Sequence, residues 1–181
     1  VLQNDKYKTA AINLYSFIEE KYRDKNENYF HTYKNGLAKY PAFLDDYTYM
    51  AEACIHLQEI TAEEKYLHKA QKITSYIFEN FEDKESPFFY FTTKKQDDVV
   101  IRKIEIYDGA TPSANAVMAK NLVYLSRVFN NKEWHQKAVT MLDSLKTIIV
   151  EHPGSFAVWA SISINLAQGI NEIAIVGKYM M

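Results

Sequence analysis

The chain has 181 residues, 48% of them hydrophobic and 24% charged, which is typical of one folded globular domain. The net charge is −2, from 23 acidic and 21 basic residues that are interspersed. No basic block favours nucleic acid or a membrane surface, so we expect neither as a partner. The single cysteine, Cys54, excludes an internal disulfide, and its presence as a lone thiol is compatible with the cytoplasm, where we expect the protein.

Six stretches space their apolar residues by three and four, which predicts amphipathic helices. These predicted helices cover residues 5–22, 44–60, 62–81, 112–129, 132–150 and 155–167. The connections between the second and third helices and between the fourth and fifth are very short. We therefore expect each of these pairs to form an antiparallel helical hairpin.

Strand signals occupy the longer connections. Asn35-Gly36 separates two aromatic-rich runs and predicts a β-hairpin. Residues 87–106 place a polar centre between two β-prone runs and predict a second, longer hairpin. Residues 153–171 carry no charge, but their proline, glycine, amide and hydroxyl residues favour a buried helix followed by a strand over a membrane span.

An internal repeat relates these elements. An offset of 68 residues pairs Met50 with Met118 and continues into the next helix, where it pairs Tyr66 with Trp134. An offset of 59 adds the first helix, since Tyr7 then falls on Tyr66. Two tetratricopeptide repeats of about 34 residues give the same period, but that array has no strands in its connections. The repeat therefore predicts an all-α fold in which helical hairpins form an α/α toroid and each copy buries its apolar face against its neighbour.

The repeat also superposes two polar clusters. Residues 44–47, "LDDY", fall on residues 112–115, "PSAN", and both clusters begin a helix directly after a predicted β-hairpin. They should lie at one end of the bundle, where unpaired backbone N–H groups and the helix dipole favour a carboxylate, a polyol or an anion. Capping accounts for part of the pattern, because Thr111 before Pro112 is a good N-cap and either Asp45 or Asp46 can cap the second helix.

Four residues exceed what capping requires, namely Asp46, Tyr47, Asp108 and Asn115, and these are candidates for function. His31 lies in a predicted strand that faces the expected mouth, and it is the histidine that we would test. No histidine pair has metal-ligand spacing, and the chain contains no phosphate-binding loop or serine nucleophile elbow. The sequence therefore indicates neither a metal nor a cofactor.

Four segments taken in order resemble a known family: "FLDDYTYMAEACIHLQEIT", "YLHKA", "DGATPSANAVMAKNLVYLSRV" and "NEIAIVG". They are similar to the C-terminal region of the thioredoxin-domain-containing, spermatogenesis-associated proteins of the DUF255 type. The resemblance implies a thioredoxin-like domain followed by an (α/α)6 toroid of the six-hairpin glycosidase type, similar to N-acylglucosamine 2-epimerase. Residues 1–181 would then be one domain, the C-terminal part of the toroid, without the earlier hairpins and the thioredoxin-like domain. The family's motif positions are Asp45, Asp46, Tyr47, Asp108, Pro112, Ser113 and Asn115.

Two hypotheses of function follow. In the first, the domain binds or processes a carbohydrate at the rim formed by the inner-helix N-termini, and a catalytic form would be glycosidase-like or sugar epimerase-like. Asp46 and Asp108 would then be the acid/base carboxylates. The substrate-binding residues would be Asp45, Tyr47, Ser113, Asn115 and His31. In the second hypothesis, a non-catalytic helical scaffold accompanies a thioredoxin-like domain, and caps and hydrogen bonds between repeats use the same polar groups.

Overall fold

The computed structural model describes residues 4–96 and 99–169. Over these residues the protein is mostly helical, with one two-stranded antiparallel sheet. The elements are α1 (Asp5–Lys21), β1 (Phe30–Lys34), β2 (Leu37–Pro41), α2 (Leu44–Thr61), α3 (Glu64–Phe81), α4 (Ala114–Val128), α5 (Lys132–Glu151), the 3-10 turn η1 (Pro153–Ser155) and α6 (Ala157–Gln168).

All six predicted helices are present, and α3, α4 and α6 each begin two residues later than predicted. The sequence suggested Thr111 as N-cap of α4, but this helix begins at Ala114 and Ser113 is its N-cap. The Ser113 hydroxyl accepts a hydrogen bond from the Ala116 N–H at 3.2 Å, while the Asp108 carboxylate holds the Ser113 N–H. These two bonds satisfy backbone donors of the first turn without Thr111.

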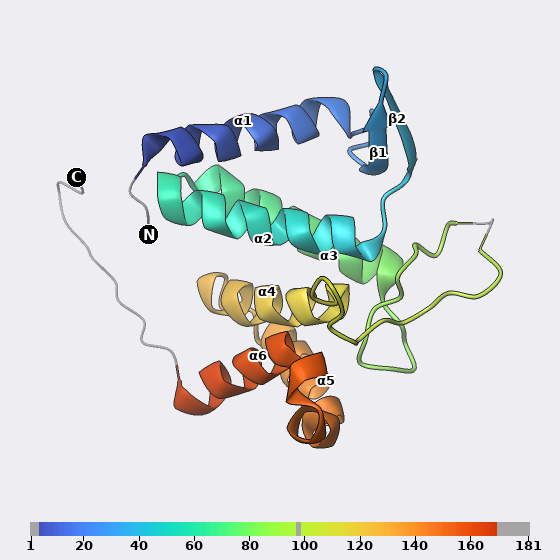
Figure 1. The fold of residues 1–181 in the computed structure, drawn as a ribbon, viewed down its shortest axis with the longest axis vertical. Helices are drawn as coiled ribbons and strands as arrows, with labels where there is room; N and C mark the ends of the chain where they lie inside the picture. The colour runs from blue at the N-terminus through green and yellow to red at the C-terminus, as the bar shows by residue number, and fades with distance from the viewer. Residues whose placement is uncertain (1–3, 97–98, 170–181) are drawn as a thin grey trace.

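The helices pack as two hairpins with α1 and α6 at the outside. α2 contacts α3, and α4 contacts α5, as the short connections predicted. Ala62 makes the tight end of α2 with a φ of 59°. Figure 1 shows α2 and α4 side by side and running in the same direction. α6 then contacts both α4 and α5.

The first predicted β-hairpin is confirmed. β1 and β2 pair antiparallel with Lys34 opposite Leu37, so Asn35 and Gly36 form a two-residue turn. Both turn residues have positive φ, 53° and 78° respectively, which is the backbone that makes Asn-Gly a preferred hairpin turn.

The second predicted hairpin is wrong. Residues 90–113 contain no regular strand where the structure describes them, and Phe89 forms only an isolated bridge with Glu82. The backbone groups that would pair across a ladder have other partners. The Asn115 side chain bonds the Phe89 N–H and C=O and the Glu105 C=O, and the Arg102 guanidinium bonds the Thr92 C=O. The segment is therefore a long ordered connection that side chains hold in place.

The core lies between α2, α3, α4 and α5. The apolar stripe predicted on α3 is buried, and so is its equivalent on α5, where Trp134, Ala138, Met141 and Leu145 point inward. The matching stripe on α1 is not buried, because Tyr7 is 61% exposed and Leu14 is 59% exposed. α1 has α2 as its main neighbour, so one side of the helix has no cover within the described structure.

None of the described helices combines the length and the hydropathy that a membrane crossing needs. The free thiol of Cys54 is buried in α2. The strand predicted after the last helix, together with "NEIAIVG", lies outside the described residues.

Candidate functional site

The N-termini of α2, α4 and α6 share one rim. The Tyr49 hydroxyl on α2 donates to the Pro112 C=O, just before α4, at 2.8 Å. The Asp108 carboxylate joins α4 to α6, because it accepts the N–H of Ser113 at 2.8 Å and the N–H of Val158 at 3.0 Å. The two polar clusters of the repeat are thus at the same end of the bundle, as the sequence predicted.

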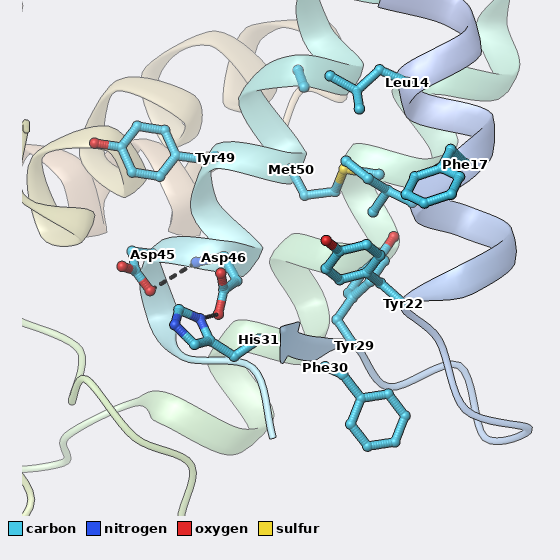
Figure 2. A pocket seen from close by; sticks show the side chains of 12 residues that line it. Leu14, Phe17, Tyr22, Tyr29, Phe30, His31, Asp45, Asp46, Tyr49 and Met50 are labelled. Carbon is cyan, nitrogen blue, oxygen red and sulfur yellow. Dashed lines mark hydrogen bonds and ion pairs between the residues drawn. The ribbon is translucent and has the colours of Figure 1, made fainter. Parts of the chain in front are cut away.

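A pocket of about 350 Å³ opens at this rim between α1, β1 and α2. Figure 2 shows His31 and Asp46 in contact, Asp45 beside them, and Met50, Phe17 and Tyr22 around the inner part of the pocket. The residues that line it are Leu14, Phe17, Ile18, Tyr22, Tyr29, Phe30, His31, Asp45, Asp46, Tyr49, Met50 and Ala53. The pocket therefore combines an aromatic and aliphatic wall with a few polar groups, which is the usual make-up of a small-molecule site.

Asp46 and His31 form the polar centre of the pocket. The His31 Nδ1 lies 2.8 Å from the Asp46 Oδ2, and the same oxygen accepts the Phe43 N–H at 2.8 Å. Asp46 is the third residue of α2, so this second bond caps the helix from a carboxylate. Burial raises the pKa of Asp46 above its usual value, although the Phe43 N–H and His31 act in the opposite direction.

Asp45 lies on the same edge of the pocket. Its Oδ1 accepts the Asp46 N–H at 2.9 Å, which fixes the carboxylate beside the first turn of α2. Three of the predicted site residues, His31, Asp45 and Asp46, therefore line one pocket.

The other predicted site residues have structural partners. Asp108 does not line this pocket, and each of its carboxylate oxygens accepts a backbone N–H. Asn115 is 1% exposed and is bonded to the connection that precedes α4. Ser113 is the N-cap of α4. These three residues are at the predicted rim, but their polar atoms hold the backbone together.

Tyr47 is also directed into the core. It is 3% exposed, its ring stacks on Tyr76 at 4.8 Å, and its hydroxyl accepts the Tyr29 N–H at 3.1 Å. Burial is the main cause that raises the pKa of Tyr47. The side chain thereby fixes the start of β1, which carries His31 toward the pocket.

Sequence reasoning missed several pocket residues. Tyr49 and Met50 lie three and four positions after Asp46 on α2, so helical spacing alone places them on the face of Asp46. Phe17 and Tyr22 come from the end of α1, and the apolar stripe of α1 pointed only to burial. In the described part of the chain, no group of three or more His, Cys, Asp or Glu side chains is placed to hold a metal ion.

Comparison with known proteins identifies relatives for about half of the chain. No protein-family model matches it. Over 101 residues, 55% of the chain, it is 31% identical to spermatogenesis-associated protein 20 of Rattus norvegicus and 30% identical to that of Homo sapiens. The chain is similar to part of spermatogenesis-associated protein 20. It is also 33% identical over 100 residues to an uncharacterised protein of Caenorhabditis elegans.

These relatives confirm the family resemblance in part. In each of them the match covers 13% of the relative's own length. The chain thus spans a small fraction of the curated relatives it matches. Their names describe neither a glycosidase nor a carbohydrate ligand, so both stay predictions.

Proposed function

We propose that the pocket at the start of α2 binds a carbohydrate. The observation that carries the proposal is that the His31–Asp46 pair and Asp45 lie in one pocket with five aromatic side chains. A sugar presents hydroxyl groups at its edges and apolar C–H faces, so it needs both kinds of contact. Carboxylates accept hydroxyl protons, histidine can donate or accept, and aromatic rings cover the apolar faces.

The pocket also has a suitable size. Its volume of about 350 Å³ is at the lower end of the range of small-molecule sites, which begins near ~300 Å³. This volume supports a small sugar or polyol. If the domain processes its ligand in the manner of a glycosidase or sugar epimerase, Asp46 is the carboxylate in contact with it, and its raised pKa suits acid/base work. Asp108 then has a structural role, because its carboxylate bonds the backbone at the starts of α4 and α6.

The scaffold hypothesis also has a specific observation in its favour. Asp108, Ser113, Asn115 and Tyr47 have their polar atoms bonded to backbone groups, as expected of a domain whose polar motifs hold its repeats together. We retain as second candidate a non-catalytic domain that accompanies a thioredoxin-like domain. The lone buried thiol of Cys54 supports the cytoplasm as the location.

We further propose that the helices are part of an (α/α)6 toroid, and the repeat supports this. On α4, Met118 and Asn121 are fully buried, and Asn121 donates to the Thr48 C=O of α2. The equivalent residues on α2 are Met50 and Ala53, and Ala53 is exposed on the groove beside α1. Another inner helix, placed before α2 as α2 is placed before α4, would cover this groove.

Calorimetric titration of the chain with a panel of neutral monosaccharides, disaccharides and polyols tests the carbohydrate proposal. We expect at least one member to bind with one site per chain. The variants His31→Gln and Asp45→Asn should weaken that binding by a factor of about 10 or more, since each loses about 1.4 kcal/mol of hydrogen bonding.

Asp108→Asn is the matched control, because it changes a carboxylate at the same rim but outside the pocket. It should lower the melting temperature and leave the sugar affinity unchanged. Failure of every panel member to bind would contradict the proposal and favour the scaffold. Binding that survives His31→Gln would contradict the placement of the sugar in this pocket.

A further inference from the structure

The His31–Asp46 pair has the geometry that orients a histidine for proton transfer. The Nδ1 of His31 is 2.8 Å from the Asp46 Oδ2, and this oxygen is itself held by the Phe43 N–H. An ionised Oδ2 is an acceptor only, so it accepts a hydrogen bond from each of its two neighbours. The His31 imidazole must then carry its hydrogen on Nδ1, and its Nε2 keeps a free lone pair.

The protein also fixes the plane of the imidazole. The His31 ring lies 4.8 Å from the Phe43 ring, and Phe43 stacks on Phe91 at 4.8 Å with an interplanar angle of 19°. Leu44 secures this stack, because its N–H bonds the Phe91 C=O at 2.9 Å. The ring is therefore held by a carboxylate at one nitrogen and by a tilted contact, with an interplanar angle of 57°, against the Phe43 ring.

The second nitrogen is open. Figure 2 shows it pointing away from Asp46, and no hydrogen bond joins it to the residues that the structure describes. The His31 side chain is 39% exposed while the Asp46 side chain is 27% exposed, so the pair is more accessible at the histidine end. A ligand at the pocket mouth can reach Nε2 without displacing a protein group.

We propose that His31 is a proton acceptor for a hydroxyl group of the bound carbohydrate, with Asp46 as its positioning residue. This inference rests on the proposed carbohydrate site and adds a chemical step to it. The Nε2 lone pair takes the proton of the substrate hydroxyl, the electrons of the O–H bond stay on the substrate oxygen, and the imidazole becomes imidazolium beside the Asp46 carboxylate. The same proton returns to substrate at the end of the step, so the site needs no other reactant.

The tautomer of His31 tests this inference without any ligand. Long-range 1H–15N spectra of the uniformly labelled chain, recorded at pH 8, report which ring nitrogen of each histidine carries the hydrogen. His31→Gln assigns the His31 signals by their loss. We expect His31 as the Nδ1–H form, whereas exposed His135 should show the Nε2–H form that free imidazole side chains prefer.

Asp46→Ala provides the matched change. It removes the oxygen that accepts the His31 Nδ1–H, so the imidazole becomes free to adopt the Nε2–H form, at the cost of the α2 cap. Acylation by diethylpyrocarbonate should follow the tautomer, with His31 reacting several-fold faster than His135 in the unchanged chain and losing that advantage in the variant. An Nε2–H signal for His31, or a tautomer and reactivity that Asp46→Ala leaves unaltered, would overturn the inference.

These results are independent of the sugar titrations. If His31 shows the Nδ1–H form but no sugar binds, His31 keeps its open basic nitrogen and the carbohydrate proposal is wrong. Sugar binding with the Nε2–H tautomer would retain the site and reject His31 as proton acceptor.

Discussion

At the scale of single residues, the polar side chains of the rim divide by what they bind. His31, Asp45 and Asp46 line the pocket. Asn115 and Asp108 bond backbone groups of a connection that has no regular strand partner. The same motif thus contains residues that face a ligand site and residues that hold the site's frame, and variants should separate the two groups.

Asn115 should be the most costly polar residue of the rim to remove. Asn115→Ala leaves the Phe89 N–H and C=O and the Glu105 C=O without their partner. Because unpaired buried groups cost about 1–3 kcal/mol each, we expect a loss of about 3 kcal/mol in the free energy of unfolding, measured with urea.

Asn121→Ala is the control for this change. It removes one bond, to the Thr48 C=O, and it also removes an Oδ1 that has no partner in the described structure. Its expected cost is about 1 kcal/mol. Equal losses in the two variants would show that the Asn115 amide does not hold the connection.

Asp108→Ala should destabilise the starts of two helices at once. The carboxylate accepts one N–H at the start of α4 and one in the first turn of α6, so its removal leaves two backbone donors unpaired. We expect a loss of about 2 kcal/mol in the free energy of unfolding. An unchanged urea midpoint would mean that water replaces both bonds, and Asp108 would again be free for another role.

Sequence reasoning reached some of these residue roles and not others. The sequence left the cap of α2 open between Asp45 and Asp46, and the structure assigns it to Asp46, whose carboxylate accepts the Phe43 N–H. The sequence placed His31 and Asp46 at one mouth, but their contact was not predicted. The bonds of Asn115 to Phe89 and Glu105 join residues 26 and 10 positions apart, and their backbone geometry has no sequence signal.

At the scale of elements, α3 and α5 have the same electrostatic arrangement. On α3, Lys69 pairs with Glu19 at 2.8 Å and lies over the Tyr29 ring. On α5, Lys137 pairs with Glu82 at 3.0 Å and lies over the Phe89 ring. Each lysine thus pairs with an acidic residue at the end of an earlier helix, namely Glu19 in α1 or Glu82 directly after α3. Each also lies over a ring of the aromatic run that follows that helix, so these contacts join successive repeat units.

Lys137→Met should give a pH-dependent loss of stability. Although burial alone would raise it, the pKa of Glu82 is lowered overall because Lys137 and Lys84 stabilise its charge. A depressed folded-state pKa contributes stability above the unfolded value and loses it as pH falls through the folded value. We expect a loss of about 1 kcal/mol at pH 7 that shrinks below about pH 4.

Lys146→Met on the exposed side of α5 is the control, and thermal unfolding between pH 3 and 7 provides the measurement. A constant difference between Lys137→Met and the unchanged chain over that range would show that the ion pair is not its cause.

Element types were predictable where the signal was local. The helical stripes and the Asn-Gly turn depend on spacing within a few residues, and the structure contains them. The second hairpin failed because aromatic residues of its first run pack into the core, whereas Val100 and Ile101 of its second run are exposed, so the two runs do not pair. Phe89 is fully buried, and its backbone is bonded to Asn115. In the first run of this segment a high strand propensity indicated residues that are buried, and not residues that pair in a β-ladder.

At the scale of the whole molecule, α1 differs from its repeat equivalents. α3 and α5 bury their apolar stripes, whereas none of the residues of α1 is fully buried. The exposed stripe of α1 and the exposed Ala53 border the same groove. Among the residues that the structure describes, the architecture is therefore closed on the side of α5 and open on the side of α1.

Hydrogen exchange should reveal this difference in the isolated chain. Local opening needs little free energy where few apolar contacts must break, so the amides of α1 should exchange at least 100-fold faster than those of α3. Mass spectrometry of peptic fragments provides the measurement, with α5 as a second protected reference. Protection of α1 equal to that of α3 would mean that the groove is already covered.

The central claim is that the ligand site lies at His31, Asp45 and Asp46, and that Asp108 and Asn115 hold its frame. Chemical-shift mapping of the labelled chain with the tightest-binding sugar tests this claim most directly. The account predicts that the backbone shifts change around residues 30–31 and 45–50 and remain unchanged around Asp108 and Asn115. Changes centred on Asp108 and Asn115, with residues 30–31 and 45–50 unaffected, would contradict it.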